Sequence, residues 1–140
     1  MNFIVARMSQ VLDTEEQGFW VFTQLMESLL PINHYTQMIG VQIDVRVFSW
    51  CIKEYLPKLW AHFNRYQFDP MFFSLNWFIC LFCDKLDQNV ALAVLDQIMI
   101  RGSEILHNIG LSILYIMQDQ IFMMRDFCKL LFIFKIKILE

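Results

Sequence analysis

Hydrophobic side chains recur at the spacing of an α-helix along most of the chain. The clearest case lies between residues 13 and 31, where four apolar positions step by three, four and three: Phe19, Phe22, Met26 and Leu29. This period predicts an amphipathic helix whose apolar stripe faces a core. Asp13, with Glu16 three residues later, forms a helix-start signal, and Pro31 ends the pattern.

The same spacing predicts six further helices, and no convincing strand-turn-strand signal interrupts them. They are expected near residues 1–12, 41–56, 58–66, 71–85, 88–100 and 103–118. Asp87 fits the start of one of them, and Gly102 suits a left-handed position just past its end. We therefore predict an all-α fold of six to seven helices without a sheet. Residues 132–139 have strand-like propensity and receive no placement.

The helix predicted after Asp69 and Pro70 is the most apolar part of the chain. An acidic residue followed by proline is a typical helix start. No charged residue occurs between positions 71 and 83, so we expect this helix to be buried on nearly every face. Its polar side chains, Ser74 and Asn76, then need hydrogen-bond partners.

Composition narrows the class of protein. Hydrophobic residues make up 57% of the 140 positions, which excludes a disordered chain. The net charge of −3 argues against a nucleic-acid-binding surface. The uncharged runs are shorter than the roughly 18 apolar residues that a membrane span needs, and the N-terminus lacks the layout of a signal peptide. We expect a soluble, cytoplasmic protein.

The residues alone indicate no catalytic, cofactor or metal site. The three histidines are far apart in sequence, and the four glycines are isolated rather than gathered in a phosphate-binding loop. Cys80 and Cys83 have a C-x-x-C spacing but lie within the apolar helix, without two further zinc ligands nearby. We interpret them as small buried hydrophobic residues. Without a family, the pattern favours a helical interaction module.

Residues 74–82, with serine, tryptophan and two phenylalanines at fixed spacing, resemble the Ser-x-x-Trp-Phe-x-x-x-Phe signature of TBC domains. These are GTPase-activating domains that act on Rab-type small GTPases. Four further segments resemble the family in the same order: residues 16–22, 42–48, 55–63 and 95–114. Leu95, Arg101 and Gly110 depart from it, standing where the family has tryptophan, glutamate and alanine.

The resemblance implies an orthogonal multi-helix array, with residues 1–118 as the C-terminal part of a TBC-like domain. Residues 119–140 are then an extension of uncertain structure. It also implies a Rab-type small GTPase as partner, without a cofactor or a metal ion. The positions that match the family motifs, to which it assigns structural roles, are Asn2, Phe19, Trp20, Asp44, Arg46, Ser74, Trp77, Phe78, Phe82, Asp96 and Gly102.

The catalytic arginine and glutamine of the family are expected upstream of Met1. TBC domains supply the arginine from an Ile-x-x-Asp-x-x-Arg segment and the glutamine from Tyr-x-Gln-Gly-Met-Asn. Met1 and the three residues after it resemble only the end of the second motif. Arg7 and Arg46 lack that arginine context and are interpreted as solvated or ion-paired. We therefore expect an incomplete TBC-like domain that is catalytically silent by itself.

Two consequences and one alternative accompany this interpretation. Apolar helix faces that have lost their covering partner are expected to self-associate. A regulator of vesicle traffic is expected in the cytoplasm, peripherally on endomembranes. The alternative is a non-catalytic helical module that binds a small GTPase or another partner without accelerating hydrolysis.

Overall fold

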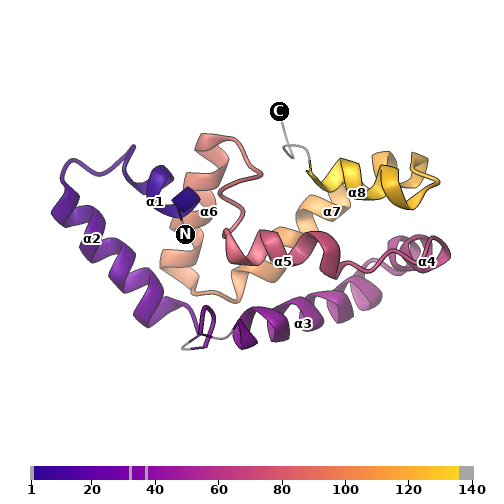
Figure 1. Ribbon diagram of the computed structural model, residues 1–140, viewed down its shortest axis with the longest axis horizontal. Coiled ribbons are helices and arrows are strands. Elements are labelled where there is room, and N and C mark those ends of the chain that lie inside the picture. The colour runs from indigo at the N-terminus through magenta and orange to yellow at the C-terminus, as the bar shows by residue number, and fades with distance from the viewer. Residues whose placement is uncertain (1, 32, 37, 136–140) are drawn as a thin grey trace.

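The computed structural model describes residues 2–31, 33–36 and 38–135, and over these ranges the chain is helical without a strand (Figure 1). The all-α prediction is confirmed, although eight α-helices exceed the six to seven expected. Their bounds are α1 (Asn2–Met8), α2 (Glu15–Gln24), α3 (Ile39–Tyr55), α4 (Pro57–Arg65), α5 (Met71–Ile79), α6 (Gln88–Arg101), α7 (Ile105–Met123) and α8 (Phe127–Lys135). A π-helical turn, η1 (Leu25–Leu29), continues α2.

Side-chain caps fix several helix starts. Asp69 and Asp87 each accept the backbone N–H two residues on, at 2.8 and 3.4 Å, as the sequence predicts. At α2 the prediction is wrong by one residue, because Thr14 rather than Asp13 is the cap. The Thr14 hydroxyl oxygen accepts the backbone N–H of Gln17 at 3.2 Å.

Gly102 ends α6 with a backbone that suits glycine. Its φ of +81° lies in the range that residues with a side chain avoid, as predicted. The accompanying ψ of −177° is extended rather than left-handed helical, a combination found almost only in glycine. The chain can therefore leave α6 abruptly and begin α7 three residues later.

Helix α5 lies in the middle of the fold, between α3 on one side and α7 and α8 on the other (Figure 1). Contrary to the prediction, it is not buried on nearly every face: Met71 and Phe72 are 43% and 57% exposed. The opposite face is fully packed. Ser74 lies on that face and finds the partner it needs, because its hydroxyl donates to the carbonyl of Pro70 at 2.8 Å.

The chain also leaves α5 earlier than predicted, at Ile79 rather than near residue 85. Leu81 and Phe82 have φ values of +48° and +62°, which reverse the chain direction in a tight turn. Such backbones cost about 1–3 kcal/mol each. Both side chains are fully buried, which stabilises the turn by about 1.5–3 kcal/mol each and offsets that cost.

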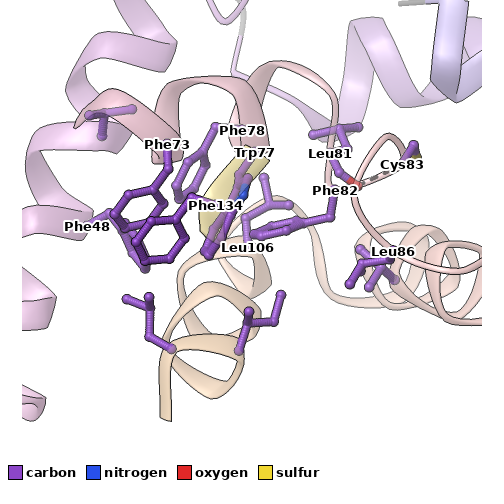
Figure 2. Close-up of a cluster of buried hydrophobic side chains, with 14 of the residues drawn as sticks. Phe48, Phe73, Trp77, Phe78, Leu81, Phe82, Cys83, Leu86, Leu106 and Phe134 are labelled. Atoms are coloured by element: carbon purple, nitrogen blue, oxygen red, sulfur yellow. Dashed lines mark hydrogen bonds between the residues drawn. The ribbon is translucent and has the colours of Figure 1, made fainter. Parts of the chain in front are cut away.

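Aromatic rings from four helices form the centre of the core. In Figure 2, Phe73 and Trp77 of α5 lie beside Phe48 of α3 and Phe134 of α8. Phe73 and Phe134 stack at a centroid distance of 3.9 Å and 12°. Phe63 of α4 contacts both Phe73 and Phe134 from the side. Contacts between α3, α4, α5 and α8 thus centre on a few large rings.

Helix α8 belongs to this core, although its last four residues have strand-like propensity. Leu130 and Phe134 are 0% and 2% exposed, whereas Phe132 between them is 65% exposed. Leu130 and Phe134 are four residues apart, which is the spacing of one face of a helix. Packing of this face against the core overrides the strand-like propensity of residues 132–135. Residues 136–139 lie outside the described ranges. Helix α7 continues without a break across position 118, where the sequence suggested a domain boundary.

Helix α2 has no buried residue, so its predicted core-facing stripe is only partly covered. Phe22, Met26 and Leu29 are half-buried, and Phe19 is 62% exposed. The prediction for Phe19 is therefore wrong. Among the described residues only α1 and the η1 turn pack against α2 to any extent. None of the helices described here is long and apolar enough to cross a bilayer.

Replacement of Phe134 by alanine tests whether α8 is an integral part of the fold. Because the side chain is buried against four other aromatic rings, we expect Phe134→Ala to lower the free energy of unfolding by about 3–5 kcal/mol. The matched control on the same helix is Phe132→Ala, at an exposed position, with an effect within about 0.5 kcal/mol. Urea denaturation measures both, and equal effects would contradict the packing of α8.

Candidate functional site

Four of the motif residues form one buried unit in the centre of the fold. Trp77, Phe78 and Phe82 are fully buried (Figure 2). Ser74 is also buried and lies one turn before Trp77 on the same helix. The Trp77 ring lies 5.4 Å from the Phe82 ring, so the turn after α5 is folded back onto the helix. These side chains hold α5 in place, and none of them is accessible to a substrate.

Phe48 of α3 packs onto this unit and explains a departure from the family pattern. Its ring is 5.4 Å from the Phe78 ring and 6.5 Å from that of Trp77. It also covers Gly110 of α7, where an added Cβ would lie only 2.7 Å from a Phe48 ring carbon. Glycine in place of the family's alanine therefore makes room for a large ring, and α3 and α7 approach closely there.

Asp44 joins three parts of the chain through two histidines. Its carboxylate lies 3.4 Å from Nδ1 of His34, and its backbone carbonyl is 3.2 Å from Nε2 of His107. The other ring nitrogen of His34 lies 3.4 Å from the carbonyl of Phe78. The segment before α3, helix α3, helix α7 and the end of α5 thus meet at one polar junction. His34 is 1% exposed, whereas the side chains of Asp44 and His107 are 20% and 18% exposed, so the junction reaches from the core to the surface.

Sequence reasoning missed this junction. It treated the histidines as too far apart to cooperate, and 63 positions separate Asp44 from His107. The one signal in the sequence that pointed to this junction was the match of Asp44 to a family motif. Among the described residues, no group of three histidine, cysteine, aspartate or glutamate side chains has an arrangement that could hold a metal ion.

The remaining motif residues, apart from Gly102, lie largely at the surface and are not gathered into one site. Asn2, Arg46 and Asp96 are exposed on α1, α3 and α6. Phe19 and Trp20 of α2 are 62% and 61% exposed and contact each other edge-to-face at 5.3 Å. Two large aromatic rings in this position are available to a partner.

Arg46 borders a groove of about 520 Å³ between α3, α4 and the start of α5. Trp60, Asn64 and Gln67 line the same groove and give it an aromatic wall with several polar groups. Arg46 forms no ion pair with any residue that the structure describes. It is therefore free to contact an acidic group of a binding partner.

Arg7 is half-buried and forms no ion pair with any residue that the structure describes, which differs from the solvated or ion-paired arginine expected from sequence. Its guanidinium donates from Nε to the carbonyl of Cys83 at 3.2 Å and from Nη2 to the carbonyl of Leu86 at 3.3 Å. These bonds fasten α1 to the turn after α5. An arginine engaged with two backbone carbonyls cannot reach toward a bound nucleotide without breaking that contact.

The placement of the catalytic arginine and glutamine upstream of Met1 stays a prediction. Met1 lies outside the described ranges, and α1 begins at the next residue, Asn2.

The chain contains one Tyr-x-Gln sequence, at residues 35–37, which the sequence reasoning did not weigh. It is followed by Met38 rather than by glycine, and Gln37 lies outside the described ranges. The Tyr35 hydroxyl donates to the carbonyl of Ile79 at 2.9 Å, and burial raises its pKa. Tyr35 therefore serves to attach the segment before α3 to the end of α5.

The thiols of Cys80 and Cys83 are buried, as expected of small hydrophobic residues. Burial raises the pKa of Cys83 to about 12. The pKa of Cys80 is also raised, mainly by burial and to a lesser extent by the negative charge of the nearby Asp84 carboxylate. Both thiols therefore stay protonated and unreactive near neutral pH. Cys128 of α8 is exposed.

Comparison with known proteins identifies the family. The model of the Rab-GTPase-TBC domain matches residues 1–122. The chain belongs to the Rab-GTPase-TBC domain family. This confirms the resemblance inferred from sequence, including the GTPase-activator class to which TBC domains belong.

Individual relatives support the assignment. The chain is similar to TBC1 domain family member 2A of Bos taurus, with 30% identity over 127 residues covering 90% of this chain and 14% of that protein. Human TBC1 domain family member 2A is 31% identical over 114 residues, 81% of this chain and 12% of that protein. Member 2B of Xenopus tropicalis is 29% identical over 113 residues, which cover 80% of this chain and 12% of that protein. The TBC chain thus spans only about an eighth of the length of these curated relatives.

The contact between Gly110 and Phe48 can be tested by adding one methyl group. We expect Gly110→Ala to lower the free energy of unfolding by about 1–3 kcal/mol, because the buried Phe48 ring has nowhere to move. Gly18→Ala is the matched control on α2, where an added Cβ meets its nearest atom at 4.0 Å. That change should be neutral or stabilising by up to about 1 kcal/mol. If Phe48→Leu does not reduce the cost of Gly110→Ala, the proposed clash is wrong.

Thiol reactivity checks the burial of the C-x-x-C pair. At pH 8 we expect iodoacetamide to modify Cys128 quickly, whereas Cys80 and Cys83 react only after unfolding, because their raised pKa values keep the thiolate fraction small. Mass spectrometry of tryptic peptides, with and without urea, gives the rate at each site. Rapid modification of Cys83 in the native protein would contradict its burial.

Proposed function

We propose that this TBC chain binds a Rab-type small GTPase and does not by itself accelerate GTP hydrolysis. Membership of the family supports the class of partner. The absence of catalysis rests on the arginines. The sequence contains no Ile-x-x-Asp-x-x-Arg segment, and Arg7 is held by two backbone carbonyls.

The observation that carries this proposal is the distribution of the motif residues. Those that match the Ser-x-x-Trp-Phe signature are buried and build the scaffold, whereas Phe19, Trp20 and Arg46 are exposed. Aromatic and arginine side chains are the residue types that most often dominate protein–protein binding energy. We assign these exposed positions to partner contacts and the buried ones to the fold.

Self-association and location complete the proposal. Large apolar side chains are exposed on α1, α2 and α3, among them Phe3, Phe19, Trp20, Ile43 and Trp50. Surfaces of this kind associate in water, so we propose that the isolated chain forms oligomers at micromolar concentration. A cytoplasmic site at the surface of endomembranes is proposed from the Rab-GTPase class of the family.

The deciding experiment measures GTP hydrolysis by a panel of Rab GTPases with and without the purified chain. We expect no acceleration, whereas an arginine finger supplies roughly 10³–10⁵-fold. A catalytically complete TBC protein serves as the positive control. Acceleration that is lost in Arg46→Ala but kept in Arg7→Ala would overturn the non-catalytic proposal and make Arg46 the catalytic arginine.

Binding is measured separately from catalysis. Each GTPase, loaded with a non-hydrolysable GTP analogue, is titrated with the chain by biolayer interferometry. We expect Trp20→Ala and Arg46→Ala to weaken binding by about 1–2 kcal/mol each, with Ile100→Ala at an exposed site on α6 as the control. Binding to none of the GTPases would favour the alternative of a helical module with another partner.

A further inference from the structure

Helices α1 and α2, with the segment that joins them, enclose a groove of about 680 Å³. Five apolar side chains line it: Val5, Met8, Leu12, Phe19 and Phe22. Gly18 forms part of its wall, and the nearest atom to a Cβ built there is 4.0 Å away. The groove therefore has the size and the lining of a site for large apolar side chains.

The charged residues that line this groove are both acidic. They are Asp13 and Glu15, and two further carboxylates, Glu16 and Glu27, are exposed elsewhere on α2 and the following turn. The sequence has no lysine or arginine between Arg7 and Arg46. Within the described ranges, none of these four carboxylates forms an ion pair. The one cation of α1 is turned away from the groove's acids, since the Arg7 guanidinium bonds to carbonyls after α5.

We propose that the α1–α2 groove binds a protein segment that carries large apolar side chains flanked by lysine or arginine. The apolar lining supplies affinity, because each large side chain that leaves water on binding contributes favourably. The uncompensated carboxylates select the partner by charge and speed its approach. Phe19 and Trp20 also belong to the surface assigned above to GTPase contacts, so the inference deepens that proposal by naming the chemistry of the segment that this surface binds.

The aromatic pair at the edge of the groove gives the site its anchor. Phe19 lines the groove and contacts Trp20 edge-to-face at 5.3 Å, and both rings are more than half exposed. Rigid aromatic rings lose little conformational entropy on binding. A lysine or arginine of the partner can lie over the Trp20 ring while its apolar neighbour enters the groove.

The test uses two synthetic helical peptides labelled with fluorescein. One combines leucine and lysine at helical spacing, and the other has glutamate in place of every lysine. We expect fluorescence anisotropy to show that the chain binds the leucine–lysine peptide at least about tenfold more tightly, with affinity falling as salt rises. Equal affinity for the two peptides would overturn the proposal.

Two variants locate the binding in the groove. Gly18→Phe fills it and should weaken binding by about tenfold or more, whereas Gly18→Ala leaves room and should bind as the wild type does. The double variant Asp13→Asn, Glu15→Gln should bind more weakly and with less dependence on salt. Circular dichroism shows whether each variant is folded. If Gly18→Phe does not fold, the charge variant decides whether the peptide binds in the groove. Unchanged binding in a folded Gly18→Phe variant, or in the charge variant, would show that the peptide binds elsewhere.

Discussion

The packing of α5 against α3 and α8 is the constraint on which the rest of the fold depends. Trp77 and Phe78 project from one face of α5. Phe48 packs against both of their rings, and Phe134 packs against the ring of Trp77. Large rings at the centre of a small domain leave little freedom in how the surrounding helices approach. The tight turn at Leu81 and Phe82, strained in its backbone, is held because its side chains are part of the same cluster.

The two ends of the chain relate to this core in different ways. Helix α8 supplies buried side chains and completes the aromatic cluster. Helix α2 supplies none, and the acidic surface that it shares with the α1–α2 segment has no cation within it. A helix whose apolar stripe is half-covered gains less from burial than one that is fully packed, so this region depends on contacts that other molecules can provide.

Much of the fold was accessible from sequence, because helical spacing is a local signal. It indicated every helix except α8, two of the caps and the positive φ of the glycine after α6. It overestimated the length and the burial of α5, since an uncharged segment indicates burial but cannot tell a helix from a buried turn. It also missed the junction of His34, Asp44 and His107, because no local pattern relates a residue of α3 to one on α7.

The sequence by itself determined the helical class and the family. Helical periodicity gives the class, and the order and spacing of the residues in the signature around Trp77 and in the other motifs give the family. Only the tertiary structure decided which motif residues are scaffold and which are surface. It also showed that Arg7 is engaged, that Gly110 accommodates Phe48, and that the α2 stripe remains open. The physical reason is that burial and hydrogen bonding depend on residues distant in the chain, whereas helical periodicity depends on near neighbours.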